Sequence, residues 1–370
     1  MKGHILFIID GLPGGGAENV VIRLCRGLQQ KGFDITLLSL SDKCEYSIPE
    51  HIDLVINADK YSGPFRRQTE IFRRAKSMDK VLEKILRQKG IPALVISNLH
   101  KTDRIVAKSK VLENLNVWFC IHGVFSKSYL ENKTGLARWL KKHKIQRVYQ
   151  DRNLICVSDA VGLDLQENLS VAARRMVTIY NPFNITEIKW NSLENNPYSG
   201  QDYILHLGRF HAVKRHDRLL EAFAMAAIPC NLLIAGHGDE KMTDKIKQKI
   251  VELGLQSRVK LIGFLTNPLP VICEAKAVVL SSDSEGLGNV LIEALICQTP
   301  VVSTNCPGGI SEIMVGELEQ YKSELTSESL AEKMRLVYQN PPLITENMYK
   351  RFDLDVVVGE YLSLIKQQNF

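Results

Sequence analysis

Short apolar segments, each followed by a helical pattern, recur along this chain. In the first half they lie at residues 4–9, 34–40, 93–97, 117–121 and 154–157, and in the second half they include YILHLG, NLLIAG and VKLIG. Apolar runs of this length are typical of strands buried on both faces, and strands that alternate with helices form parallel sheets. The sequence therefore predicts an α/β protein.

A stretch rich in Asn, Pro and Ser interrupts this pattern near the middle of the chain. It reads IYNPFNITEIKWNSLENNPYSGQDY and precedes the strand that begins at Tyr203. Turn-forming composition of this kind marks a boundary, and 370 residues suit two domains that each have a core. We expect one domain over residues 1–182 and a second over residues 183–345.

Composition argues against several other classes of protein. The eight cysteines lie mostly in apolar segments without a CxxC pair, which indicates reduced, buried thiols in the cytoplasm and neither a disulfide framework nor a zinc site. The first apolar run is short and ends before Asp10, so we expect a strand there and no signal peptide. No run approaches the roughly 20 apolar residues of a membrane-spanning helix.

Two acidic residues surround a glycine-containing turn within residues 281–312. Glu293 lies inside VLIEALI, where a buried carboxylate requires hydrogen-bond donors. Glu285 precedes the turn at 286–288, whose backbone N–H groups at a helix start can face an anion. Asn289 shares a helix face with Glu293, so the segment offers the groups that a nucleotide sugar needs. A capped core helix with one acid reaching solvent is the alternative.

A loop with two cations follows the strand that begins at Tyr203. Arg209 and Lys214 lie in this loop, before an amphipathic helix. Open α/β sheets bind ligands outside the carboxyl ends of their strands, and these side chains suit a diphosphate. Two later strands end at Gly236 and Gly263.

This series of motifs, with Glu285 and Glu293 in the spacing E-x7-E, resembles the carboxyl-terminal domain of the retaining glycosyltransferases of family 4 that build bacterial lipopolysaccharide and surface polysaccharide. The resemblance implies the GT-B fold, two Rossmann-like domains with a cleft between them. It continues in the segment Gly15 to Glu18, which follows the first strand. A dinucleotide-binding fingerprint is disfavoured there, because Asn19 stands where the third glycine of GxGxxG belongs. In the family the terminal helix returns to the first domain, as we expect for residues 346–370.

The resemblance also implies roles for individual residues. Arg209 and Lys214 would stabilise the leaving diphosphate, and Glu285 would bind the hydroxyls of the sugar. His122, at a strand end, would contact the donor sugar, and Glu293 would bind the ribose. The other expected donor-binding positions are Gly15, Gly16, Gly263, Gly286, Leu287, Gly288, Asn289 and Phe264, although the last could equally belong to the core.

The expected reaction is the transfer of a hexose or hexosamine from a UDP-sugar, with retention of configuration. The UDP-sugar is a substrate, and no cofactor is expected. The only Asp-x-Asp motif, at residues 353–355, lies in the terminal region. We therefore expect no metal site, and cationic side chains and helix N-termini would neutralise the diphosphate.

Positive charge is concentrated in the first half of the chain. Residues 1–182 carry 29 Lys and Arg against 18 Asp and Glu, whereas residues 183–370 carry 18 against 23. Cations interleave with aromatic residues in PFRRQTEIFRRAK and LARWLKKHKIQR. Such segments can lie on anionic lipid, at roughly 1 kcal/mol per basic residue, or can be solvated helices with their aromatic residues in the core. No nucleic-acid-binding module accompanies the charge, so nucleic acid is not an expected partner.

Two such clusters favour a lipid-linked or lipopolysaccharide-core glycan as acceptor, used by an enzyme peripheral on the inner face of the cytoplasmic membrane. Two other functions stay open. A GT-B enzyme with a soluble acceptor would not need the basic aromatic surface. A non-catalytic sugar-binding subunit of a polysaccharide-assembly complex would not need Arg209, Lys214, Glu285 and Glu293 together.

Overall fold

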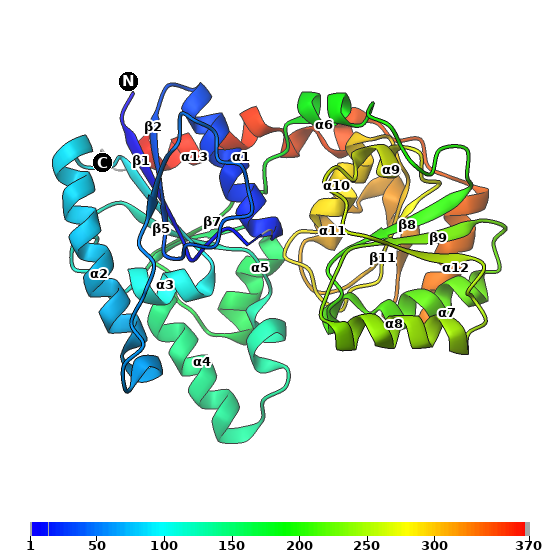
Figure 1. The fold of residues 1–370 in the computed structure, drawn as a ribbon, viewed down its shortest axis with the longest axis horizontal. Helices are drawn as coiled ribbons and strands as arrows, with labels where there is room; N and C mark the ends of the chain where they lie inside the picture. Colours follow the sequence, from blue (N-terminus) through cyan, green and yellow to red (C-terminus); the bar gives the residue numbers. More distant parts are fainter. Residues whose placement is uncertain (1, 14, 367–370) are drawn as a thin grey trace. The chain divides into compact units, whose positions relative to one another are not determined.

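The computed structural model of the chain describes residues 2–13 and 15–366. The chain forms two compact units (Figure 1), Met1–Pro182 with Leu354–Phe370, and Phe183–Asp353. Each unit contains one sheet, and every pair of neighbouring strands in it is parallel. The predicted α/β class is therefore confirmed.

The sheet of the first unit has seven strands in the order β3-β2-β1-β4-β5-β6-β7. The strands are β1 (His4–Ile9), β2 (Asp34–Ser39), β3 (Asp53–Ile56), β4 (Leu94–Asn98), β5 (Val117–Ile121), β6 (Asn153–Cys156) and β7 (Arg175–Thr178). The five apolar segments of this half form β1, β2, β4, β5 and β6. The two edge strands, β3 and β7, were not predicted, because each has four residues and none of them is fully buried.

The helices of the first unit lie on both sides of its sheet in Figure 1. They are α1 (Gly16–Gln30), α2 (Arg66–Lys89), α3 (His100–Val106), α4 (Gly135–Tyr149), α5 (Asp159–Leu163) and α13 (Leu354–Lys366), with π-helical turns η1 (Ser126–Leu130) and η2 (Asp164–Asn168). The returning helix α13 starts at Leu354, later than the expected residue 346. The chain before it, including η5 (Glu346–Met348) and η6 (Lys350–Phe352), belongs to the second unit.

The sheet of the second unit has six strands in the order β10-β9-β8-β11-β12-β13. The strands are β8 (Tyr203–Leu207), β9 (Asn231–Ala235), β10 (Val259–Gly263), β11 (Val278–Leu280), β12 (Val301–Thr304) and β13 (Lys322–Ser323). The helices are α6 (Ile185–Asn191), α7 (His216–Ala226), α8 (Glu240–Glu252), α9 (Leu269–Cys273), α10 (Asn289–Ile296), α11 (Ile310–Ile313) and α12 (Ser327–Gln339), with 3-10 turns η3 (Ala212–Lys214) and η4 (Gly316–Tyr321).

The strand order reverses once in each sheet. In the first unit β1 lies between β2 and β4, and in the second β8 lies between β9 and β11. Open α/β sheets bind ligands outside the carboxyl ends of the strands at such a reversal. The expected ligand-binding segments are therefore those that follow β1 and β4, and those that follow β8 and β11.

None of the helices in the described part of the chain is both long and apolar enough to cross a membrane.

The contact between α1 and α13 gives a test of the fold. A Cβ on Gly27 of α1 would lie 2.7 Å from Val358 Cγ2 and 2.9 Å from Leu354 Cδ1 of α13, closer than side chains normally pack. Gly27→Ala should therefore lower the free energy of unfolding by about 1–3 kcal/mol. Gly359→Ala is the matched control, because that exposed glycine has no atoms near its Cβ position, and alanine there should stabilise the helix by about 0.5–1 kcal/mol. Urea denaturation followed by circular dichroism measures both changes, and shifts of the same sign would contradict the packing of α13 on α1.

Candidate active site

Lys214 and Glu285 meet where the strand order of the second sheet reverses. Lys214 lies in η3, after β8, and Glu285 lies in the loop after β11. Lys214 Nζ is 2.6 Å from Glu285 Oε1, and the two side chains are only 20% and 13% exposed. Two residues expected to share a site are thus in direct contact. A shielded pair of this kind leaves a poorly solvated charge if either partner is removed.

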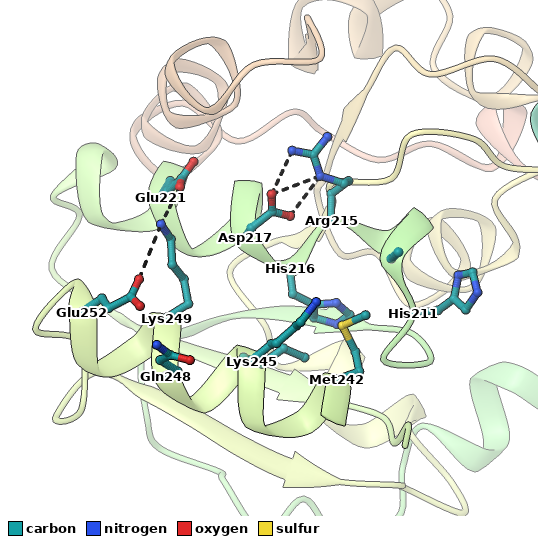
Figure 2. Close-up of a pocket in the computed structure, with 12 residues that line it drawn as sticks. His211, Arg215, His216, Asp217, Glu221, Met242, Lys245, Gln248, Lys249 and Glu252 are labelled. Carbon is teal, nitrogen blue, oxygen red and sulfur yellow. Dashed lines mark hydrogen bonds and ion pairs between the residues drawn. The ribbon is translucent and has the colours of Figure 1, made fainter. Parts of the chain in front are cut away.

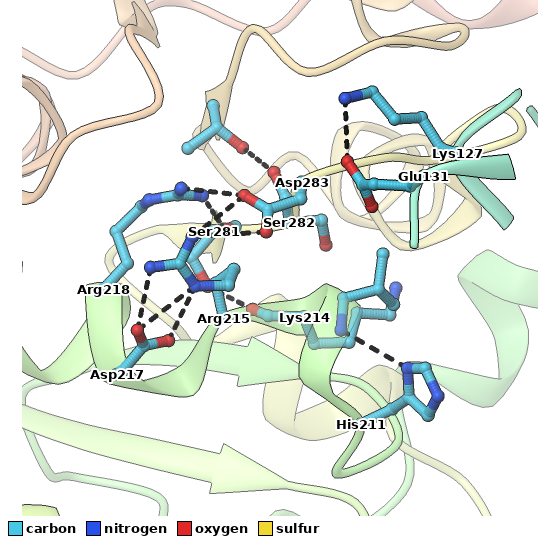
Figure 3. Close-up of polar contacts among 12 residues, drawn as sticks. Lys127, Glu131, His211, Lys214, Arg215, Asp217, Arg218, Ser281, Ser282 and Asp283 are labelled. Atoms are coloured by element: carbon cyan, nitrogen blue, oxygen red, sulfur yellow. Dashed lines mark hydrogen bonds and ion pairs between the residues drawn. The ribbon is translucent and has the colours of Figure 1, made fainter. Parts of the chain in front are cut away.

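Hydrogen bonds tie the two loops around this ion pair together. Ser282 Oγ donates to Glu285 Oε1 at 2.6 Å, and Ser281 Oγ donates to the carbonyl of Lys214 at 2.7 Å. The Asp283 backbone N–H donates to the carbonyl of Val213 at 2.8 Å. Figure 3 shows the serines and Asp283 beside the turn that carries Lys214. The hydrogen bonds between the loops that follow β8 and β11 therefore fix the position of Lys214.

An arginine network lies next to the pair. Arg218, whose side chain is almost fully buried, donates to Asp283 Oδ1 at 2.7 Å and to the carbonyl of Ser281 at 2.8 Å. Arg215 contacts Asp283 at 3.2 Å and Asp217 at 2.8 Å, and hydrogen bonding to Asp217 raises the pKa of its guanidinium. Sequence reasoning missed these residues, because charges at a helix start look solvated and the partner Asp283 is distant in sequence.

Glycine is required behind Glu285. Gly308 has φ +122°, and a Cβ there would collide with the carbonyl oxygen of Glu285. The Glu285 N–H donates to Pro307 O at 3.1 Å, and the Gly309 N–H donates to Gly286 O at 3.1 Å. The loop of residues 307–309 thereby supports the predicted glycine-containing turn. Only a residue without a Cβ at position 308 allows the two backbone segments to approach this closely.

The expected donor-binding positions after this turn lie on one short element. Gly288, with φ +99°, is the N-cap of α10, and Asn289 and Glu293 are one helical turn apart on that helix, both partly exposed. The side chain of Leu287 is buried, so any part it takes in donor binding falls to its backbone. These positions place backbone amides directly after Glu285 and a carboxylate on the helix that follows, and their roles stay predictions.

The remaining expected residues of this unit are more open. Arg209 is exposed, and among the described residues it has no ion-pair or hydrogen-bond partner. Gly263 ends β10 with φ +73°, and its carbonyl accepts from the Gly236 N–H at 2.8 Å. Phe264 is 65% exposed, and its ring meets that of His237 edge-on at 5.5 Å. The alternative that Phe264 belongs to the core is therefore wrong.

A pocket of about 480 Å³ opens between α7 and α8 of this unit (Figure 2). Its lining includes Arg215 and Lys249, but neither Lys214 nor Glu285. Several of the lining charges are paired with one another, since Lys249 Nζ lies 2.7 Å from Glu221 Oε1 and Arg215 contacts Asp217. The pocket therefore lies beside the ion pair of Lys214 and Glu285 but does not open onto it.

Two buried histidines lie under η3. His206 and His216 meet edge-on, with ring centroids 5.0 Å apart. Burial lowers the pKa of His206 to about 4 and that of His216 to about 3, so both rings are neutral near pH 7. Within the described residues no group of three His, Cys, Asp or Glu side chains is arranged to hold a metal ion.

The first unit also carries an ion pair at its strand reversal. Lys101, three residues after β4, lies 2.8 Å from Asp10, which follows β1, and Arg74 of α2 lies 2.5 Å from the other oxygen of the same carboxylate. Arg74 also donates to the carbonyl of Leu40 at 2.7 Å and is buried. From its place in PFRRQTEIFRRAK, Arg74 is expected to belong to the basic surface. That assignment is wrong, because its charge is used inside the unit.

His122 lies at the carboxyl end of β5, as its position in the sequence predicts. Its Nε2 is 3.1 Å from Asn98 Oδ1, and burial lowers the pKa of the ring to about 4. Since an amide oxygen only accepts, Nε2 carries the proton in this pairing. Asn98 ends β4, so His122 and Asn98 bridge neighbouring strand ends. Sequence reasoning missed Asn98, which looked like the polar end of a strand.

Gly15 and Gly16 lie where the chain enters α1. Gly15 is the N-cap of this helix, and its carbonyl accepts from the Tyr46 hydroxyl at 2.8 Å. A Cβ at Gly15 would collide with the side chain of Glu18, which is buried. The Glu18 carboxylate therefore lies directly against this glycine. Its contribution to donor binding stays a prediction.

The two basic aromatic segments differ in what they expose. On α4 Trp139 is 56% exposed, and Leu136 and Leu140 are exposed beside it. On α2 Phe72 is exposed, but Arg73 forms an ion pair with Asp59 at 2.5 Å. The alternative that these segments are solvated helices with their aromatic residues in the core is therefore wrong. The α4 segment offers the freer surface, since two of the four arginines near the start of α2 are held in ion pairs.

The buried histidines predict a pH effect on stability. A histidine that is neutral in the fold and has a pKa near 6.5 when unfolded contributes stability that is present above pH 6.5 and is lost as the pH falls toward 4. His216→Phe keeps a ring against Phe210 and His206 but cannot be protonated. The variant should therefore gain in melting temperature over the parent as the pH is lowered from 7.5 to 5. His237→Phe, at an exposed position, is the control. A gain that is equal at both pH values would show that His216 is not the buried neutral group.

Comparison with known proteins gives matches for both halves of the chain. Residues 14–187 match the family model described as Glycosyltransferase Family 4, and residues 189–353 match that of Glycosyl transferases group 1. One relative is the N-acetylgalactosamine-N,N'-diacetylbacillosaminyl-diphospho-undecaprenol 4-alpha-N-acetylgalactosaminyltransferase of Campylobacter jejuni, 29% identical over 82% of this chain and 81% of its own length. Another is the amylovoran biosynthesis glycosyltransferase AmsD of Erwinia amylovora, 25% identical over 84% of this chain and 83% of its own length.

A solved structure supports the same architecture. Anabaena Alr3699/HepE, solved in complex with UDP and glucose, superimposes with a TM-score of 0.79 at 18% identity, over 99% of this chain and 100% of that one. This likeness confirms the predicted GT-B fold class, with two Rossmann-like domains.

Proposed function

Because the chain belongs to the family 4 glycosyltransferases, whose two domain models together match residues 14–353, we propose that it transfers a hexose or hexosamine from a UDP-sugar to a lipid-linked or lipopolysaccharide-core glycan. The observation that carries the proposal is the shielded ion pair of Lys214 and Glu285 at the strand reversal of the second sheet. Its lysine follows β8 at the carboxyl edge of the sheet, where α/β proteins bind phosphate ligands. Its carboxylate can accept hydrogen bonds from sugar hydroxyls.

The proposed chemistry places charge near these groups. As the bond between the anomeric carbon and the diphosphate oxygen breaks, negative charge develops on the diphosphate. Lys214, held in place by Glu285, would stabilise this charge without moving, which is the form of electrostatic stabilisation that lowers barriers most. The exposed Arg209 would add a second cation. The acceptor oxygen would bond to the anomeric carbon on the face that the diphosphate leaves, and its proton would pass to a diphosphate oxygen. The sugar would then keep its configuration, and no metal ion would be required.

The proposed donor and acceptor follow from the relatives. A protein of the same fold was solved with UDP and glucose, and the Campylobacter relative is named for an acceptor on diphospho-undecaprenol. In this chain Trp139, Leu136 and Leu140 form an exposed apolar strip on the cationic helix α4. Such a strip is suited to the surface of an anionic bilayer, where a lipid-linked acceptor is found. This would place the enzyme on the inner face of the cytoplasmic membrane.

A soluble acceptor is the second candidate for the same chemistry. It is favoured by the burial of Arg74 and by the ion pair of Arg73, which reduce the free charge of one of the two basic segments. The non-catalytic sugar-binding subunit is not retained, because the chain belongs to a family of transferases.

Loss of the diphosphate cations tests the proposed site. We expect a panel of nucleotide sugars, assayed by released nucleotide, to identify one UDP-sugar as donor. Lys214→Ala and Arg209→Ala should each lower kcat by about 10²-fold or more, the scale of losing one preorganised charge stabiliser. Lys245→Ala, which removes an exposed lysine from the neighbouring pocket, should leave turnover within about twofold of the parent. Near-parental kcat in both cation variants, or a strict requirement for added Mg²⁺ or Mn²⁺, would contradict this mechanism.

Vesicle binding tests the proposed acceptor surface. The chain should sediment with liposomes that contain phosphatidylglycerol and should be released by NaCl, because exposed charges are screened within about 8 Å at physiological ionic strength. Substituting Trp139, Lys144 and Arg147 of α4 by Ser should abolish sedimentation. The same change at two exposed lysines of α8, Lys241 and Lys247, is the control. A parent that ignores these liposomes at low salt and glycosylates a water-soluble acceptor would favour the second candidate.

A further inference from the structure

Three hydrogen-bonding side chains form a series at the strand reversal of the first sheet. Asp103 of α3 is fully buried, and its two oxygens accept from Ser97 Oγ at 2.5 Å and from the Tyr149 hydroxyl at 2.7 Å. The Tyr149 oxygen also lies 2.8 Å from His100 Nδ1. The series therefore runs from Asp103 through Tyr149 to His100.

His100 occupies the position of a ligand-binding residue. It follows β4 by two residues, and β4 is one of the two strands beside the reversal of the sheet order. Between them Leu99 has φ +73°, a backbone conformation that a branched side chain adopts only at a cost. The turn therefore directs His100 to this edge at the expense of local strain.

Aromatic rings hold the His100 imidazole in place. Its ring lies 5.2 Å from Phe125, 5.0 Å from Tyr129 and 5.7 Å from Tyr149. His100 is 9% exposed. Its Nε2 has no hydrogen-bond partner among the described residues, and this atom is not fully buried. One nitrogen is thus engaged inside the unit, and the other is open to solvent.

The series decides which nitrogen of His100 carries a proton. An ionised Asp103 can only accept, so Tyr149 donates to it. The Tyr149 oxygen then accepts from Nδ1–H of His100, which leaves a lone pair on Nε2. In this state the open nitrogen is a hydrogen-bond acceptor held in a fixed direction.

We propose that His100 binds the acceptor glycan, with Nε2 accepting a hydrogen bond from an acceptor hydroxyl, and that Tyr149 and Asp103 are positioning residues that keep His100 in the required tautomer. The proposal rests on the function proposed above, to which it adds a contact on the acceptor. Sugar hydroxyls are donors at every ring position, and a neutral imidazole nitrogen is a good acceptor for them.

Protonation of Asp103 would reverse the series. Burial raises the pKa of the Asp103 carboxyl to about 7 and lowers the pKa of His100 to about 3. One proton from solvent would enter at Nε2, the proton on Nδ1 would pass to Tyr149, and that of Tyr149 would pass to Asp103. Nε2 would then be a donor. Acceptor binding should therefore weaken below about pH 7.

The other ionisable groups around the series do not explain a transition near pH 7. The cations Arg104 of α3 and Lys141 of α4 face His100 and lower its pKa. Burial raises the pKa of Cys120 on β5 to about 12, and it also raises that of Tyr129 on η1. Asp103 is thus the group that changes charge in this range.

Nitrogen NMR of the whole chain, labelled with ¹⁵N-histidine, tests the series directly and needs no substrate. The His100 resonances, assigned by their loss in His100→Gln, should report Nδ1–H at pH 8.5 and Nε2–H at pH 5.5. Tyr149→Phe should abolish this dependence. Tyr129→Phe, which removes a hydroxyl from the same aromatic cluster, should keep it. A single tautomer at both pH values in the parent, or conversion of His100 to imidazolium, would overturn the proposed series.

Kinetics test the contact with the acceptor. The amide oxygen of Gln can reach the position of Nε2 and accept there, whereas the shorter Asn reaches only the position of Nδ1, where its NH2 group can donate to Tyr149. With N-acetylhexosamine-diphospho-undecaprenol in detergent as acceptor, His100→Asn should raise the acceptor KM about tenfold, or about 1.4 kcal/mol, and His100→Gln less than about threefold. The KM for the UDP-sugar should not change. Equal acceptor KM values for the two variants, or an effect confined to the donor KM, would refute the contact even if the NMR result holds. Failure of the parent to use any UDP-sugar would instead overturn the proposed function and leave the NMR test intact.

Discussion

The shielded contact between Lys214 and Glu285 fixes the geometry of the candidate site in the second unit. It joins two loops that are 71 residues apart in sequence and that only the reversal of strand order brings side by side. Removing one partner of a buried pair costs about 3–5 kcal/mol, and less here, because both groups keep some exposure. The serines and Asp283 that surround the pair supply the hydrogen bonds that such charges require. A diphosphate beside Lys214 would give the lysine a second anionic partner in a position already fixed.

The strand reversal of the first unit carries a different set of polar groups. Its reversal also carries an opposite-charge pair, Asp10 and Lys101, and Arg74 adds a buried cation to it. Neutral groups lie nearby, because the pKa of His100 and that of His122 are lowered by burial. The two sheet edges therefore differ in character. The second is charged and suited to phosphate, whereas the first combines one ion pair with uncharged acceptors and donors suited to hydroxyls.

Local patterns in the sequence were sufficient for β1, β2, β4, β5, β6, β8, β9 and β10, and they assigned Lys214 and Glu285 to one expected site without predicting their ion pair. The short buried strands β11 and β12 were not predicted. Local patterns failed for the edge strand β3, whose residues are half exposed, since such a segment has no apolar run. They also failed for Arg74, which appeared to be one more cation on a polar helix but meets Asp10 from 64 residues away.

The series of Asp103, Tyr149 and His100 was missed for a related reason. His100 and Asp103 lie close together in sequence, Tyr149 lies 46 residues beyond Asp103, and none of the three stands in a motif that the sequence analysis identified. What joins them is a contact between α3 and α4 that no local pattern reveals. Residue roles that depend on such contacts become visible only in the folded chain.

Calorimetric titration with UDP and with uridine tests directly whether Lys214 binds the diphosphate. The difference between the two binding free energies isolates the diphosphate. If Lys214 binds it beside Glu285, this difference should fall by at least about 1.4 kcal/mol, or tenfold in affinity, in Lys214→Ala, and should be unchanged in Lys245→Ala. An equal difference for the parent and Lys214→Ala would show that the diphosphate is bound elsewhere and would contradict the account of the site.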